Sequence, residues 1–176
     1  MMRSRFFCRY QNFSGIASNT PPQELVNELH QCFKAFDEVI SKYSIEKIKT
    51  IGDAYLCASG IPVKNPNHAL QVVSAAQEML EAIRHRNNIP GGIRFEFRVG
   101  IHTGPIVAGV VGIKKFSYDI WGDTVNTASR MEQNSEAGKI NVSETTYNLI
   151  KEQFSCVYRG AIAAKNKGML KMYFVD

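Results

Sequence analysis

The sequence predicts an α+β fold, or α/β sandwich, in which a sheet carries helices, and two kinds of hydrophobic spacing predict it. Apolar residues recur at helical spacing in segments 20–42 and 65–83. They alternate strictly with polar residues from Phe95 to Ile101, which is typical of a strand. The two kinds of segment also follow one another along the chain. That order favours helices packed on a sheet.

Length, composition and charge suit one globular domain. With 176 residues and a hydrophobic fraction of 44%, the chain can bury a full core, so we expect one domain over residues 1–176. No apolar run could cross a bilayer and no signal peptide is visible, so we expect a cytoplasmic protein without a membrane segment. The four cysteines lack metal-ligand spacing and are expected to be buried thiols. The net charge of +5 is spread out, which favours a solvated surface over nucleic-acid binding.

Cap and turn signals divide the N-terminal half. Thr20 to Gln23 has the pattern of a capping box with proline at the first helical positions, which predicts the start of a long amphipathic helix. Gly52 and Asp53 separate two short segments that have the pattern of strands, which predicts a hairpin. The expected elements are a helix over 20–42, strands over 46–51 and 54–60, and a helix that opens at 65–67.

The C-terminal half is expected to contain more strands. We predict a turn over 102–105, and a strand over 106–111 that returns from it to pair with the alternating strand before it. The remaining expected elements are a helix after Gly122, a strand over 139–142, a helix from Ser143 to about Glu152, and strands near 156–161 and 170–175.

The run from Lys114 to Glu132 carries the clearest chemical signal. It contains a carboxylate, Asp119, an amide, Asn126, and a guanidinium, Arg130, around an aromatic-glycine turn. The last two are four residues apart, so a helix would place them on one face. An amide can hold a sugar or a base edge, and a guanidinium can hold a phosphate bidentately. The run therefore predicts part of a nucleotide site.

Two residues of the predicted hairpin could join such a site. Asp53 lies at a tight glycine turn, where a carboxylate can bind Mg²⁺ when phosphates supply the other ligands. The simpler interpretation is a turn-forming aspartate. Lys49 near the strand end is either a solvated cation or a donor to a phosphate or a base.

Four stretches in register resemble the catalytic domain of class III nucleotide cyclases, the adenylyl and guanylyl cyclases. They are residues 46–56 (EKIKTIGDAYL), 97–132, 138–144 (GKINVSE) and 159–175. The resemblance implies a ferredoxin-like, palm βαββαβ core with extra C-terminal strands and helices. It also implies a dimer with sites at the interface. There, attack of the ribose 3′-OH on the α-phosphorus yields the 3′,5′-cyclic nucleotide and pyrophosphate.

The resemblance also implies roles for particular residues. One protomer supplies two aspartates that hold two Mg²⁺ or Mn²⁺ ions, and Asp53 matches the second of these. The other protomer supplies the catalytic residues, which Asn126 matches for the ribose and Arg130 for the α-phosphate. Lys165 matches the lysine that holds the terminal phosphates, although Asn166 follows it where many relatives have glycine.

Two positions of the resemblance concern the base. Lys49 and Asp119 match the purine-recognition pair. Adenylyl cyclases typically have a lysine there, which donates to adenine N1, and an aspartate or threonine, which accepts from the amino group. Guanylyl cyclases typically have glutamate and cysteine. The pair therefore implies ATP as the substrate, because a lysine facing the N1–H donor of guanine would lose affinity.

The N-terminal strand departs from the family pattern. Phe13 and Ser14 fix the register of the stretch 7–14, and Arg9 then falls where the family has its first metal-binding aspartate. A fixed cation at that point would repel a metal ion. We therefore expect an N-terminal strand that is altered or truncated relative to the family, and a metal site that lacks one ligand.

Two functions from different classes follow. The first is an adenylyl cyclase domain that makes cyclic AMP from ATP, with activity impaired by Arg9. The second is a degenerate nucleotide-binding or dimerisation module that acts as the partner of another cyclase. A guanylyl cyclase is less favoured. In a homodimer both sites would carry Arg9, whereas in a heterodimer with an intact cyclase one site would be complete.

Four other side chains carry weaker signals. His102 is expected to be structural, and Trp121 is expected to pack in the protein instead of stacking on a base. Glu132 and Glu136 are expected at a solvated helix end.

Overall fold

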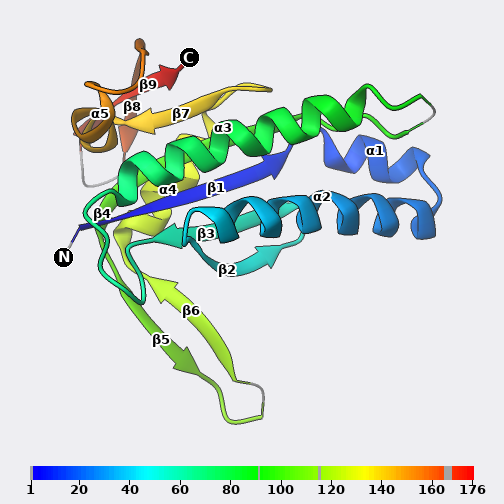
Figure 1. Ribbon diagram of the computed structural model, residues 1–176, viewed down its shortest axis with the longest axis horizontal. Coiled ribbons are helices and arrows are strands. Elements are labelled where there is room, and N and C mark those ends of the chain that lie inside the picture. The colour runs from blue at the N-terminus through cyan, green and yellow to red at the C-terminus, as the bar shows by residue number, and fades with distance from the viewer. Residues whose placement is uncertain (1, 91, 115, 165–167) are drawn as a thin grey trace.

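The computed structural model of the protein describes residues 2–90, 92–114, 116–164 and 168–176 (Figure 1). The helices are α1 (Phe13–Asn19), α2 (Pro22–Lys42), α3 (His68–Asn87), α4 (Asp123–Gln133) and α5 (Glu144–Ile150). The strands are β1 (Met2–Tyr10), β2 (Glu46–Ile51), β3 (Ala54–Ser59), β4 (Phe97–Pro105), β5 (Val107–Val111), β6 (Ser117–Trp121), β7 (Ile140–Ser143), β8 (Cys156–Ala164) and β9 (Gly168–Val175). None of the helices in these ranges is long and apolar enough to cross a membrane.

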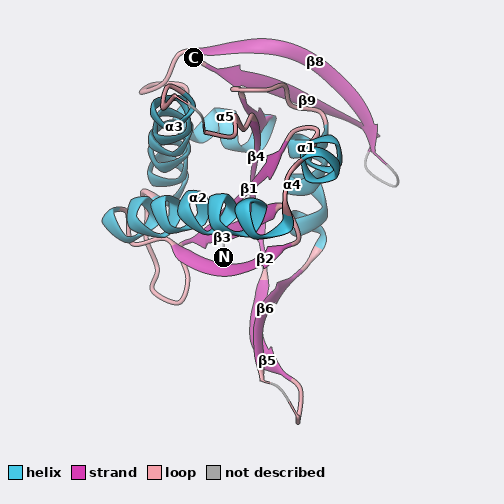
Figure 2. Ribbon diagram, turned by 90° about the vertical axis from the view of Figure 1, so that its right-hand side faces the viewer, coloured by secondary structure: helices cyan, strands magenta, loops and turns pink. Residues whose placement is uncertain are grey.

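Seven strands form one mixed sheet in the order β2-β3-β1-β4-β7-β9-β8. Among its strand pairs in the described ranges, β4–β7 is parallel and the others are antiparallel. The first four strands with their helices form the expected βαββαβ core, and the predicted α+β class is confirmed. β5 and β6 form a separate two-stranded ribbon that projects from the body as an arm (Figures 1 and 2).

Successive side chains of β1 point to opposite faces of the sheet and join two separate hydrophobic clusters there. Phe6, Cys8 and Tyr10 belong to the larger cluster, together with residues of α2 and α3. Phe7 points the other way and belongs to a smaller cluster with Ala128 of α4. Helix α4 therefore covers the face of the sheet that also carries Arg9, two residues beyond Phe7.

β1 forms although arginines occupy three of its positions. Arg3 Nε donates a hydrogen bond to the carbonyl of Gly60 at 2.8 Å. Arg5 is fully buried, and burial followed by the charge of Arg3 lowers its pKa to about 10. The strand is nevertheless fixed on both sides, because it pairs with β3 and with β4.

Most predicted elements are confirmed. These are the helix that ends at Lys42, the hairpin around Gly52, the helix after Gly122, and the strands and helix beyond it. Ser143 caps α5 as expected, because its Oγ accepts a hydrogen bond from the Thr146 N–H. Cys8, Cys32 and Cys57 are buried free thiols, as predicted, whereas Cys156 is only partly buried.

Three details of the prediction are wrong. Residues 102–105 continue β4 instead of forming a turn, and β5 pairs with β6, not with β4. Thr20 does not cap α2, because its hydroxyl donates to the carbonyl of Ile16 and so closes α1, a helix that was not predicted.

Gly100 of β4 sets how closely α4 approaches the sheet. A Cβ atom at this position would lie 1.9 Å from the backbone nitrogen of Glu132 and 2.4 Å from its Cα. Both obstacles are backbone atoms, so a side chain here would have to displace the whole last turn of α4.

We expect Gly100→Ala to destabilise the protein by at least about 2 kcal/mol, because it forces α4 off the sheet. Thermal unfolding followed by circular dichroism measures this. Gly92→Ala is the control, since its new Cβ would lie 3.5 Å from the nearest atom, the carbonyl oxygen of Ile89. An unfolding midpoint that Gly100→Ala leaves unchanged would contradict the close contact.

Candidate nucleotide site

The structure brings the two predicted base-recognition residues into direct contact. Lys49 Nζ of β2 donates to Asp119 Oδ2 of β6 at 2.5 Å, although the residues are 70 positions apart. The base of the arm therefore lies against the hairpin. The side chain of Asp119 is 18% exposed and that of Lys49 is 38% exposed, so both are open to a ligand.

The environment of Asp119 keeps its carboxyl ionised. Burial alone would raise its pKa, but hydrogen bonds from Lys49 and from the Ile120 N–H, together with the charge of Lys49, outweigh burial. The pKa of Asp119 is therefore lowered from its ordinary value. The pair presents a cationic donor beside an anionic acceptor, which suits a base edge that accepts at one atom and donates at the next.

Asn126 and Arg130 lie on one face of α4, as predicted. Both line a cavity of about 630 Å³ between α4 and β8, where Ile162 and Ala163 form the opposite wall. Neither side chain has a hydrogen-bond or ion-pair partner within the described ranges, so both are free to bind a ligand. Lys165, predicted to hold phosphates, lies outside the described residues.

Asp53 lies at the turn between β2 and β3, next to the end of β1. Its carbonyl oxygen accepts a hydrogen bond from the Tyr10 N–H at 3.4 Å, and Arg9 pairs with Ala54 in the adjoining strand. Positions 9 and 53, which the resemblance matches to the metal-binding aspartates, are thus neighbours in this protein.

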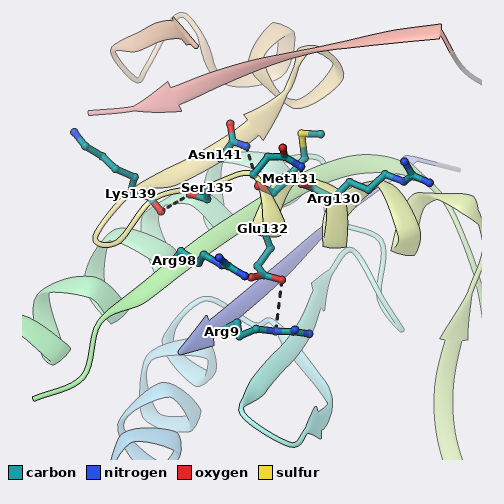
Figure 3. A network of polar contacts seen from close by, with 9 residues as sticks. Arg9, Arg98, Arg130, Met131, Glu132, Ser135, Lys139 and Asn141 are labelled. Carbon is teal, nitrogen blue, oxygen red and sulfur yellow. Dashed lines mark hydrogen bonds and ion pairs between the residues drawn. The ribbon is translucent and has the colours of Figure 1, made fainter. Parts of the chain in front are cut away.

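Arg9 is engaged with a buried carboxylate instead of with Asp53. Its Nε lies 3.6 Å from Glu132 Oε2, an ion pair too long for a hydrogen bond. Arg98 Nε donates to the other carboxylate oxygen of Glu132 at 2.6 Å, so two guanidinium groups from β1 and β4 share one carboxylate from α4 (Figure 3). Among the described residues, Arg9 has no other side-chain partner.

The expectation that Glu132 lies at a solvated helix end is wrong, because its side chain is fully buried. The sequence did contain a signal for this. Thr124, Thr127, Ala128 and Met131 are buried at helical spacing, and Glu132 lies one turn after Ala128 on that same face. Glu136 is exposed as expected, and its side chain lies 3.5 Å from Arg159.

The residues at the first metal position do not fit a metal ion. A cation, Arg9, occupies it, and its Nε is buried against Glu132. Within the described part of the chain, no group of three or more His, Cys, Asp or Glu side chains could hold a metal. Asp53 alone retains the character of a ligand for a hard cation.

His102 belongs to a chain of buried hydrogen bonds, and this is consistent with a structural role. Its Nδ1 lies 2.6 Å from Ser143 Oγ, and Thr146, Thr103 and Ser4 continue the chain to Nδ1 of His68. This series has five hydrogen bonds, and each needs one proton. The four hydroxyls supply four, so one histidine supplies the fifth from its Nδ1. The tautomers of the two histidines are therefore coupled. Trp121 is 39% exposed and lines a separate cavity at the base of the arm.

The Lys49–Asp119 contact generates a pH prediction. The pKa of Asp119 is lower in the folded state than in the unfolded chain, so the contact contributes stability above the unfolded-state pKa and loses it as pH falls through the folded-state pKa. We expect Lys49→Met to cost less than about 1 kcal/mol at neutral pH, because the pair is partly solvated, and nothing at strongly acidic pH.

Carbon-13 NMR titration of the Asp119 carboxyl tests the cause directly. Its pKa should rise in Lys49→Met and stay unchanged in Lys64→Met, which alters an exposed lysine with no partner in the described chain. The same titration curve in all three proteins would refute the assigned cause.

Comparisons with known proteins agree on one family. The sequence profile of the adenylate and guanylate cyclase catalytic domain matches residues 4–176. An adenylate cyclase of Mycobacterium tuberculosis (strain H37Rv) is 39% identical over 172 residues, which cover 98% of this chain and 39% of that protein. The human guanylate cyclase soluble subunit beta-2 is 41% identical over 164 residues, which cover 93% of this chain and 27% of that protein. The chain thus spans less than half the length of these relatives.

A solved structure gives the same answer. The catalytic core of a rhodopsin–guanylyl cyclase with converted specificity, in complex with ATPαS, has a TM-score of 0.93 and 36% identity, over 99% of this chain and 94% of that one. Fold and sequence therefore agree along almost the whole chain, and the protein belongs to the family of class III adenylate and guanylate cyclase catalytic domains.

Proposed function

We propose that this domain is of the adenylyl type and takes ATP toward 3′,5′-cyclic AMP and pyrophosphate at a dimer interface. The contact between Lys49 and Asp119 carries the proposal. Adenine presents an acceptor at N1 and a donor at its amino group, which match the ammonium and the carboxylate. Guanine presents a donor at N1 and an acceptor at O6, which would set donor against ammonium and acceptor against carboxylate.

Two side chains on α4, Asn126 and Arg130, support the cyclisation reaction. Asn126 offers an amide that can orient the ribose, so that its 3′ oxygen faces the α-phosphorus. Arg130 offers a guanidinium for the charge that grows on the α-phosphate oxygens as the new P–O bond forms and the bond to pyrophosphate breaks. Neither group has a partner among the described residues, so binding would break no hydrogen bond or ion pair between them and this part of the chain.

Relatives in the family include both specificities, and one of them supports adenine for this chain. The solved core that holds ATPαS is a guanylyl cyclase with converted specificity, so this fold accepts an adenine nucleotide when its specificity is changed. The present chain has a lysine and an aspartate at the proposed base-recognition positions in its own sequence, without any conversion.

The arm supports assembly as a dimer. Its apolar side chains are far more exposed than a monomer in water favours, with Ile113 at 94% and Phe116 at 77%. A second protomer would bury them. Each site would then combine Arg9 and Asp53 of one protomer with the base and phosphate groups of the other.

A second function has its own observation. The ion pair of Arg9 with Glu132 fills the position of one metal ligand with a cation, which favours a domain that binds nucleotide and completes the site of another cyclase. In such a heterodimer, the site that combines the partner's aspartates with Lys49, Asp119, Asn126 and Arg130 would be complete.

Exchange of the two base-recognition residues, Lys49 and Asp119, tests the preference for ATP over GTP. We expect the wild-type domain to bind a fluorescent ATP analogue at least about tenfold more tightly than the GTP analogue, and Lys49→Glu with Asp119→Cys to reverse the preference. Lys34→Gln makes the same net charge change of −1 on an exposed face of α2 and should leave the preference intact. Equal affinities in the wild type, or no change in the double variant, would rule out the adenylyl assignment.

Complementation tests whether this domain completes the site of another cyclase. The domain is mixed with a family member that has both aspartates but carries alanine at its own asparagine and arginine of the N-x-x-x-R pattern. We expect cyclic AMP to form only in the mixture, and Arg130→Ala in this chain to lower the rate about 100-fold. Arg94→Ala, on an exposed loop, is the control. Activity no higher than that of either protein alone would reject the partner function.

A further inference from the structure

We infer that Arg9 takes the place of the first metal ion in holding the phosphates of the nucleotide, so that this domain binds ATP without a divalent cation, and that Glu132 positions Arg9 for this. The inference rests on the proposed function, because it concerns the metal half of the same site.

Within the described residues, one nitrogen of Arg9, Nε, lies against a charged partner. Its Nε is buried and faces Glu132 Oε2, whereas the two terminal nitrogens extend past the carboxylate (Figure 3). Those terminal nitrogens have no partner in the described chain, and the side chain is 31% exposed. A guanidinium fixed at Nε and open at both terminal nitrogens offers the planar pair of donors that binds a phosphate bidentately.

Glu132 explains why the guanidinium is held in this way. Arg9 and Arg98 are paired positions on adjacent strands, so their side chains lie on the same face of the sheet. The two oxygens of Glu132 face one arginine each, which directs both Nε atoms toward α4. The carboxylate is fully buried and cannot turn to solvent, so the orientation of Arg9 is set by the packing of α4 on β4.

The charge of the cluster also fits this function. An aspartate at position 9 would leave three carboxylates, with Asp53 and Glu132, against the guanidinium of Arg98, a formal charge of −2 that one divalent cation would neutralise. With Arg9, the same four positions carry two carboxylates and two guanidiniums, and their formal charge is zero. The exchange therefore adds the charge of one Mg²⁺ ion at the position where the family has its first metal ligand.

Charge is the part of the metal's contribution that a guanidinium can replace. Arginine stays protonated and does not coordinate an oxygen, so it cannot convert the 3′-hydroxyl into an alkoxide. Arg9 would therefore support binding of the triphosphate better than its cyclisation. This gives the partner function a physical basis, since such a domain could hold ATP and stabilise a dimer without turning the nucleotide over.

The test measures the affinity of the whole domain for fluorescent ATP and adenosine analogues, in excess EDTA and in Mg²⁺. We expect wild-type ATP affinity to change less than about threefold between the two conditions. Arg9→Gln should weaken binding in EDTA about tenfold or more, because it removes a charge-assisted contact. Arg9→Asp should bind poorly in EDTA and regain affinity in Mg²⁺ or Mn²⁺. Arg94→Gln, which removes an exposed arginine of the loop before β4, should behave as the wild type.

Glu132→Gln tests the positioning. We expect this variant to lower the affinity for ATP in EDTA about as much as Arg9→Gln does. The affinity for adenosine, which has no phosphate, should stay unchanged. If that variant does not fold, Arg9→Lys carries the test, because it keeps the charge but loses the bidentate geometry and should fall between the wild type and Arg9→Gln.

The outcomes separate this inference from the proposed function. ATP binding that is selective over GTP but needs Mg²⁺ would overturn the role of Arg9 and leave the adenylyl assignment standing. Equal binding by the wild type and Arg9→Gln in EDTA would also overturn it. Binding in EDTA that is lost in Arg9→Gln but does not distinguish ATP from GTP would uphold Arg9 and overturn the base assignment. Absence of nucleotide binding in every condition would overturn both.

Discussion

The buried carboxylate of Glu132, shared by Arg98 and Arg9, is the interaction on which the arrangement of the site depends. A carboxylate removed from water destabilises a protein unless cations face it, and here the two cations come from adjacent strands of the sheet. Glu132 thereby ties the last turn of α4 to β1 and β4, where Gly100 leaves room for close contact. The same helix carries Asn126 and Arg130 on another face. One ion-pair network thus positions groups for both halves of the site.

The two halves of the site have different characters. On the proposed base side lie the Lys49–Asp119 contact and two side chains of α4, Asn126 and Arg130, that have no partner among the described residues. On the proposed metal side, the position that the resemblance matches to an aspartate carries the guanidinium of Arg9, which pairs with Glu132. Arg9 is therefore integrated into the structure and is more than a missing ligand. In the site that we propose, a cation held in this way would face the phosphates of ATP at the dimer interface.

Local sequence signals predicted most of the fold, and the failures have physical causes. Periodicity and turn residues were sufficient for α2, the β2–β3 hairpin, α4 and the C-terminal strands. They failed at residues 102–105, where β4 runs on because buried hydroxyls such as that of Thr103 are satisfied by tertiary hydrogen bonds. They failed for the partner of β5, since the arm is solvated on both faces and has little hydrophobic contrast. The resemblance placed Lys49 beside Asp119, but the pairing of Arg9 with Glu132 joins residues far apart in sequence and follows only from the packing of α4.

The most direct test of this account is a crystal structure of the domain grown with ATPαS in the presence of EDTA. The account predicts a bound nucleotide with the terminal nitrogens of Arg9 at about 3 Å from phosphate oxygens, while Nε of Arg9 still faces Glu132. A nucleotide that appears only when Mg²⁺ or Mn²⁺ is present, with Arg9 turned away from its phosphates, would contradict the account.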